Sequence, residues 1–181
     1  HNLISTVPMT PVRRGQYIGD VKYRKMISKR LRSLGLNEVK TYTLTSPDMA
    51  VMFDYEGKVR KTLPNPMSVD KSVIRTSILP SLLNTYDYNK ARKVNDVLIY
   101  EISKTYDKDY NEDTKIALLM KGNYITNNWQ GSLKVDFYLI KGIIENILDY
   151  LGLKNRYSFK VDAIDNMHPG MSAVILVDRE P

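Results

Sequence analysis

Residues 63–106 read LPNPMSVDKSVIRTSILPSLLNTYDYNKARKVNDVLIYEISKTY and hold more distinctive chemistry than a generic soluble domain needs. The stretch opens with PNPMS at 64–68. Each proline restricts its own φ and disfavours helix in the residue before it, so this segment predicts a rigid extended turn. Such a turn could meet a ligand, but prolines placed this way more often shape a crossover or a packing surface. Asn65, Pro66 and Met67 are therefore candidate structural or partner-contact residues.

The apolar run at 73–83, VIRTSILPSLL, contains one arginine, Arg75. An unpaired buried guanidinium is very costly, so Arg75 needs a partner if it lies within the sheet. The β-rich run at 96–106 predicts a long strand with one carboxylate near its middle, Glu101. Glu101 is the best partner by residue type. A structural ion pair is the favoured interpretation, and an anion site is the alternative.

The proline inside the apolar run suits the first turn of a helix, which is predicted over 80–93. Leu79 and Pro80 stand at its start and are candidates for a partner surface. Arg92 and Lys93 stand at its end, where positive charge suits the helix dipole.

A second helix is predicted over 20–34, with Asp20 as the capping residue and Gly35 as the left-handed residue that ends it. At 100° per residue, one face is apolar: Tyr23, Ile27, Leu31 and Leu34. The opposite face is basic: Lys22, Lys25, Lys29 and Arg32. Because no aromatic residue interleaves with these charges, we interpret this face as solvated, with a phosphate-binding stripe as the alternative.

The remaining segments predict short strands, one more long helix and loops. Strands are expected at 38–44, 59–63, 114–121, 157–163 and 172–178. A short helix is expected at 47–53 after Ser46, and a long one at 135–151 ended by Gly152. Loops are expected at 107–113 and 122–134, with Trp129 as a packing anchor and His168 as a turn residue. The long helix has a predicted core stripe: Tyr138, Leu139, Ile143, Ile147, Leu148 and Leu151.

Composition narrows the class of protein. The 181 residues suffice for one domain with a buried core, and no apolar run approaches the roughly 20 residues that span a bilayer. The absence of cysteine excludes disulfides and thiolate metal sites. A net charge of +7 favours an acidic partner such as RNA, with a merely basic protein equally open. Since the chain starts without methionine, we expect it to be a piece of a longer polypeptide.

An ordered series of motifs resembles a known family. The series comprises NPMS at 65–68, RTSILPSLL at 75–83, NKAR at 89–92, YEI at 100–102, VDFYLIKG at 135–142 and HPGMSA at 168–173. It resembles the synthetase-like core domain of bacterial phenylalanyl-tRNA synthetase beta subunits, over about residues 20–178. Periodicity alone predicts only an α+β domain, an antiparallel sheet flanked by helices. The resemblance implies the class II aminoacyl-tRNA synthetase architecture.

The resemblance also implies an organisation and partners. Residues 1–19 would be the tail of a preceding domain and a linker. Residues 20–181 would be the core domain, truncated at its C-terminal end. The expected partners are the alpha subunit, in an α2β2 heterotetramer, and tRNA(Phe), with no membrane. ATP and magnesium would serve the whole complex, with no cofactor in this segment, and the location would be cytoplasmic.

Three functions compete: a catalytically silent domain that assembles with the alpha subunit, an active adenylating domain, and a tRNA-binding module. An active class II site needs an arginine on the α-phosphate, and the resemblance places that arginine at position 107. Asp107 stands there instead, with the opposite charge. We therefore expect no catalytic residue in this segment. Possible tRNA contacts are the cations of the first helix together with Arg92 and Lys93.

Overall fold

The computed structural model describes residues 2–7, 9–53, 62–107, 109–129, 131–168 and 170–180. Within these ranges the helices are α1 (Gly19–Ser33), α2 (Pro47–Val51), α3 (Leu79–Lys90) and α4 (Phe137–Tyr150), with a 3₁₀ turn at Val69–Lys71. The strands are β1 (Asn37–Glu38), β2 (Leu44–Thr45), β3 (Val73–Ile74), β4 (Val97–Tyr106), β5 (Glu112–Lys121), β6 (Asn123–Asn128), β7 (Gly131–Lys134), β8 (Tyr157–Val161) and β9 (Ala173–Val177). None of the helices found in these ranges is long and apolar enough to cross a membrane.

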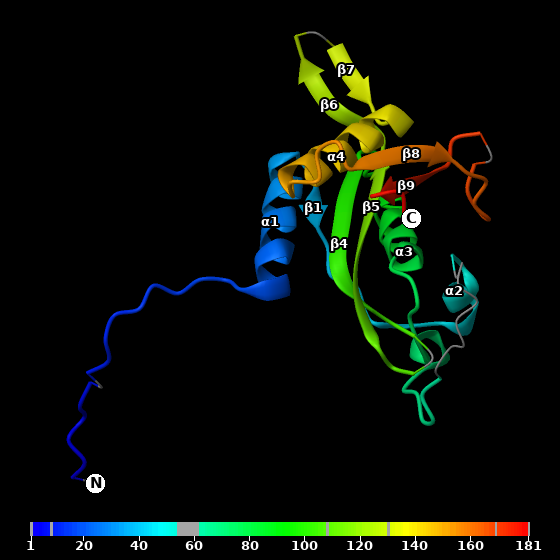
Figure 1. The fold of residues 1–181 in the computed structure, drawn as a ribbon. Helices are drawn as coiled ribbons and strands as arrows, with labels where there is room; N and C mark the ends of the chain where they lie inside the picture. The colour runs from blue at the N-terminus through cyan, green and yellow to red at the C-terminus, as the bar shows by residue number, and fades with distance from the viewer. Residues whose placement is uncertain are drawn as a thin grey trace.

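The long hairpin of β4 and β5 is the centre of the molecule (Figure 1). Its two strands pair antiparallel along their full length, from Val97 opposite Lys121 to Tyr106 opposite Glu112. The short strand β1 adds to the other side of β4 in parallel, so the order is β1-β4-β5. The α+β class is confirmed, but the central sheet is mixed rather than wholly antiparallel.

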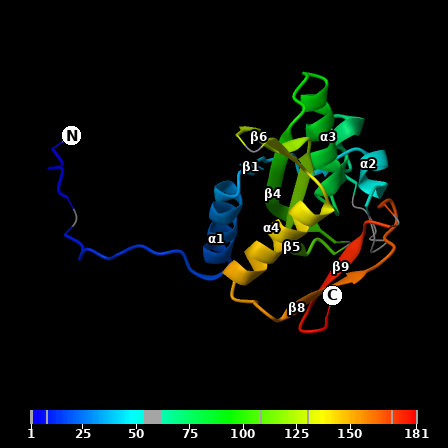
Figure 2. The same cartoon turned by 90° about the horizontal axis from the view of Figure 1, so that it is seen from above.

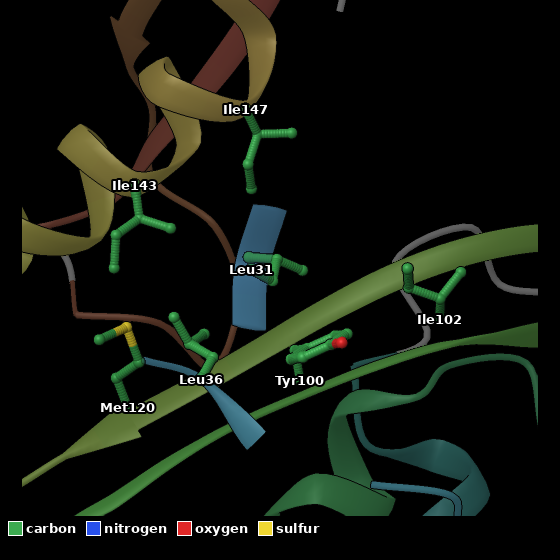
Figure 3. Close-up of a cluster of buried hydrophobic side chains, with 7 residues drawn as sticks. All are labelled: Leu31, Leu36, Tyr100, Ile102, Met120, Ile143 and Ile147. Atoms are coloured by element: carbon green, nitrogen blue, oxygen red, sulfur yellow. The ribbon is translucent and has the colours of Figure 1, made fainter. Parts of the chain in front are cut away.

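Helices cover both faces of this sheet, as Figure 2 shows, with α1 and α4 on one side and α3 on the other. Side chains alternate along a strand, so neighbouring β4 residues enter different cores. Tyr100 and Ile102 pack with Leu31 of α1 and with Ile143 and Ile147 of α4 (Figure 3). On the opposite face, the second cluster joins β4 and β5 to α3 through Val97, Ile99, Ala117, Ile78 and Leu82.

Local signals set several helix ends as predicted. Gly35 follows α1 with φ of +84°, and Leu36 N–H donates to the Leu31 carbonyl at 3.1 Å, which closes the helix. Ser46 accepts a hydrogen bond from Met49 N–H at the start of α2. Gly152 ends α4 at φ of +85°. The predicted cap Asp20 is wrong: Ile18 occupies the cap position, and Asp20 lies in the first turn.

Several predicted segments differ in extent. The strand expected at 38–44 is two short strands, β1 and β2, which join different sheets. The helix expected to reach 93 ends at Lys90. The loop at 107–113 is shorter, because β5 already begins at Glu112. Of the strand expected at 59–63, residues 59–61 lie outside the described residues, and Thr62 makes an isolated bridge to Val73.

The largest error concerns residues 122–134, which were expected to be a loop. They form the β6–β7 hairpin, which projects from the rest of the fold (Figure 1). Trp129 lies near its tip with 89% of its surface exposed, so it is not a packing anchor. The pairing contains register irregularities, and these break the alternation that would have marked two strands.

Two predicted core positions are also wrong. Tyr23 and Tyr138 are exposed, Tyr138 at 77%, although each shares a helix face with buried residues. Both lie within the first two turns of their helices. The predicted strands at 157–163 and 172–178 are confirmed as the β8–β9 pair, and His168 lies in the turn region between them.

The described residues before Gly19 form no helix or strand, and their side chains are exposed. Figure 1 shows this segment extending away from the folded body.

Candidate functional site

Arg75 and Glu101 form a buried ion pair beside the central sheet. Arg75 Nη2 lies 3.0 Å from Glu101 Oε1, and the two residues are 1% and 0% exposed. Glu101 comes from the middle of β4, and Arg75 directly follows β3. The predicted pairing is therefore confirmed.

Further hydrogen bonds satisfy the rest of both charged groups. Arg75 Nη1 donates to Thr41 Oγ1 at 2.8 Å, and Arg75 Nε donates to the Lys104 carbonyl at 3.1 Å. Thr41 Oγ1 in turn donates to Glu101 Oε2 at 2.6 Å. A guanidinium committed in this way holds three chain segments together. It is not free to bind an incoming anion, so the geometry favours the structural pair over the alternative of an anion site.

The turn between β4 and β5 contains Asp107, the residue at the expected phosphate-binding position. Its Oδ1 accepts hydrogen bonds from Asp109 N–H at 2.8 Å and Asn111 N–H at 2.9 Å. Its Oδ2 accepts from the Asn111 side-chain amide at 2.9 Å. The carboxylate therefore organises the turn of the hairpin, a role that aspartate commonly performs.

Lys104, at the base of this turn, is also held in an ion pair. Lys104 Nζ lies 2.6 Å from Glu112 Oε2, and Tyr106 O–H donates to the other oxygen of Glu112 at 3.2 Å. The hydrogen bond from Lys104 and its charge lower the pKa of Glu112. Lys108 lies outside the described residues. A triphosphate needs several cations that point toward it. In the described part of this turn, Lys104 instead forms an ion pair with Glu112.

In the part of the chain that the structure describes, no group of three or more histidine and acidic side chains is placed to hold a metal ion. Around Asp107, the described carboxylates instead make hydrogen bonds and an ion pair within the turn.

The candidate partner residues fall into two groups. The turn with Asn65, Pro66 and Met67 is exposed, and Met67 is fully so at 103%, next to the exposed Val69. Pro80 is instead buried, and Leu79 packs against the second core cluster. Of these candidate residues, those of the turn are therefore the more exposed group.

The candidate RNA contacts are separated on the surface. Lys22, Lys25 and Lys29 are exposed along α1. Arg32 Nη1 instead pairs with Glu38 at 3.2 Å. Beyond α3, the Arg92 guanidinium stacks over the Tyr88 ring at 3.3 Å, and Lys93 adopts a φ of +64° in the following turn.

A polar cluster under α1 was not predicted from the sequence. Ser28 O–H donates to Glu38 Oε2 at 3.0 Å, and the Tyr100 hydroxyl lies within 3.2 Å of both residues. Burial raises the pKa of Glu38, but hydrogen bonds from Ser28 and Lys40 and the charge of Lys40 outweigh it, so that the pKa is lowered. Burial raises the pKa of Tyr100. The sequence signal for this cluster was Ser28, a polar residue next to the apolar positions Ile27 and Leu31 of α1.

Comparison with known proteins shows which family the chain belongs to. A family model described as "Phenylalanyl tRNA synthetase beta chain CLM domain" matches residues 3–181. The chain belongs to this family. It is 36% identical to the phenylalanine–tRNA ligase beta subunit of Shouchella clausii (strain KSM-K16), over 98% of the chain and 23% of that relative. With the Bacillus subtilis (strain 168) beta subunit the identity is 33%, over the same shares. The chain thus spans about a quarter of the length of these beta subunits.

Solved structures agree on the fold. The chain is similar to a pyrrolysyl-tRNA synthetase from Desulfitobacterium hafniense, with a TM-score of 0.61 at 14% identity, over 86% of this chain and 53% of that one. A histidine–tRNA ligase subunit from Alicyclobacillus acidocaldarius gives a TM-score of 0.56 at 12% identity, over 87% and 46%. The architecture of this beta-chain domain is therefore that of the class II aminoacyl-tRNA synthetases, as the motifs implied.

Proposed function

We propose that this chain is a non-catalytic, synthetase-like domain of a phenylalanyl-tRNA synthetase beta subunit. In this proposal it supports assembly with the catalytic alpha subunit, in an α2β2 enzyme that charges tRNA(Phe) with phenylalanine in the cytoplasm. ATP and magnesium act at the alpha subunit. Residues 1–19 are the tail of a preceding domain and a linker, and residues 20–181 are the core domain.

The observation that carries the proposal is the state of the turn after β4. Where adenylation needs an arginine to stabilise charge developing at phosphorus, Asp107 bonds within its own turn. Arg75 is buried against Glu101 and cannot take over that task. These contacts support a synthetase fold that does not itself carry out adenylation.

An assembly role is supported by the exposed turn before β3. Met67 and Val69 present apolar surface on a segment stiffened by two prolines. A stiff apolar turn loses little conformational entropy when a partner covers it, which favours its use in a stable interface.

Contact with tRNA is a secondary role in this proposal. It is supported by the net charge of +7 and by the exposed lysines along α1. Phosphate contacts of this kind strengthen binding without reading sequence.

Co-purification tests the assembly role. The chain is co-expressed with a tagged phenylalanyl-tRNA synthetase alpha subunit of a close relative, and we expect the alpha subunit to retain it through washing at moderate salt. A chain that folds, by circular dichroism, but is not retained would contradict the proposal. The tagged alpha subunit of a different class II synthetase is the specificity control.

A further inference from the structure

A small cavity lies between α1 and the segment that follows β1. Its volume is about 220 Å³, and its polar lining comes from Arg24, Lys25 and Ser28 on α1, with Glu38 and Lys40 opposite. Small-molecule sites usually measure roughly 300–1,000 Å³. This cavity is therefore too small for a nucleotide, but it can admit one anionic group.

The lining is strongly positive. It holds three cations and one carboxylate, and that carboxylate is already engaged: Glu38 lies 3.2 Å from Arg32 Nη1 and 3.4 Å from Lys40 Nζ. Lys40 also donates to the Ile102 carbonyl at 2.6 Å. Glu38 thus pairs with Arg32 and Lys40. The other two cations of the lining, Arg24 and Lys25, form no ion pair with Glu38.

Arg24 carries a second, independent sign of a ligand. Its Nε is shielded from solvent and has no hydrogen-bond partner among the described residues. Buried donors in proteins are nearly always paired with protein atoms or ordered water, so an unpaired one marks a place where a bound group or water can accept. Lys25 on the same wall lies 5.7 Å from the Tyr17 ring, which supplies an aromatic neighbour that the helical pattern alone did not reveal.

We propose that this pocket binds a phosphate group of an RNA backbone, with Arg24 as its principal donor. The forked donors of arginine match a phosphate. Lys22 and Lys29 lie exposed beside Lys25, so the positive surface continues past the pocket, as a polyanion requires and a single acidic side chain does not. This inference rests on the proposed RNA contact and is independent of pairing with the alpha subunit.

The experiment measures binding of the chain alone to a tRNA(Phe) transcript and to a tRNA transcript of another specificity, as a function of salt. We expect Arg24→Gln to weaken both complexes several-fold and to reduce the slope of log K against log salt by about one, as loss of one phosphate contact does. Arg24→Lys should restore the slope and only part of the affinity, because it keeps the charge without the Nε donor.

Arg179→Gln is the matched control, since it removes the same charge at an exposed position after β9. Equal affinities and slopes for Arg24→Gln and Arg179→Gln would overturn the proposal. Unchanged RNA binding together with lost alpha-subunit retention would overturn it too, and would assign the pocket to an acidic side chain of a protein partner.

If Arg24→Gln fails to fold, Lys25→Gln on the exposed rim provides the same slope test. A failure of co-purification alone would leave this inference standing.

Discussion

Single residues decide how the segment before α3 is attached to the sheet. Arg75 and Glu101 are 26 positions apart in sequence and meet as a shielded pair, with Thr41 bridging them. Each ionised group is costly to bury alone, so the two depend on each other. The pair therefore stabilises the fold only as long as both partners are present.

Arg75→Met should lower the free energy of unfolding by about 3–5 kcal/mol, because it leaves Glu101 buried without its partner. Denaturant unfolding measures the change. The double variant Arg75→Met/Glu101→Gln should recover part of the loss. Arg156→Met is the control: it breaks an exposed pair with Asp178, and exposed pairs contribute little to stability. Equal losses for the two arginine variants would contradict the assignment of Arg75.

Glu38 should make stability depend on acid pH. Its pKa is lowered in the folded state, so it contributes stability that is complete above its ordinary value of 4.5 and is lost as pH falls through the lower folded value. Glu38→Gln should therefore flatten the decline of the unfolding free energy below about pH 4.5. Urea unfolding at a series of pH values measures this. The exposed Glu180→Gln is the control, and a wild-type slope in Glu38→Gln would refute the linkage.

At the scale of elements, the β6–β7 hairpin depends on one glycine. Gly122 stands between β5 and β6 at φ of +93°. A Cβ there would lie 2.4 Å from Asp96 Oδ1 and 2.5 Å from the Asn95 carbonyl oxygen. Asp96 also accepts a hydrogen bond from Asn123 N–H at 2.7 Å, so the turn and the loop before β4 are built together.

Gly122→Ala should destabilise the chain by more than about 1 kcal/mol, through both the positive φ and the contact with backbone atoms. Gly142→Ala is the matched control, and the opposite effect on stability is expected. Gly142 lies within α4 with nothing within 4 Å of a new Cβ, so alanine should stabilise by about 0.5–1 kcal/mol. Thermal unfolding of the two variants should shift in opposite directions. Shifts of the same sign would mean that the turn geometry is not required.

The exposed turn before β3 should matter to a partner and not to the fold. Met67→Asp should weaken retention by the tagged alpha subunit at least several-fold while leaving the unfolding midpoint unchanged, since Met67 is fully exposed. Met9→Asp is the matched control in the extended N-terminal segment, with 101% of its surface exposed. Equal retention of both variants would place the interface elsewhere.

For the molecule as a whole, the non-catalytic proposal predicts that this chain does not bind the reaction intermediate. Calorimetry with a non-hydrolysable phenylalanyl-adenylate analogue should give no binding by this chain. Asp107 would instead repel a triphosphate, by about 1 kcal/mol per like-charge contact at 4 Å in water. The catalytic alpha subunit serves as positive control. Micromolar binding that disappears when residues 101–109 are mutated would contradict the non-catalytic proposal.

Sequence reasoning recovered the features that are local or that depend on residue type. Glycine readily adopts the positive φ that ends a helix, and serine caps a helix start. The ends of α1 and α4 therefore followed from Gly35 and Gly152, and the start of α2 from Ser46. The pairing of Arg75 with Glu101 followed from the cost of a lone buried charge. The ordered motifs also placed the chain in its family, because several weak signals in one order are specific together.

By itself, the sequence thus determined the α+β class, the main helices and the two long strands that pair as β4 and β5. Only the tertiary structure decided which residues distant in sequence share a site. Ser28, Glu38 and Tyr100 form one polar cluster, and Arg24 and Lys40 face one cavity, because α1 packs across β4 at a particular angle. Periodicity records which face of an element is apolar. It does not record which side chains of that face a neighbouring element will cover, and Tyr23 and Tyr138 proved to be exposed.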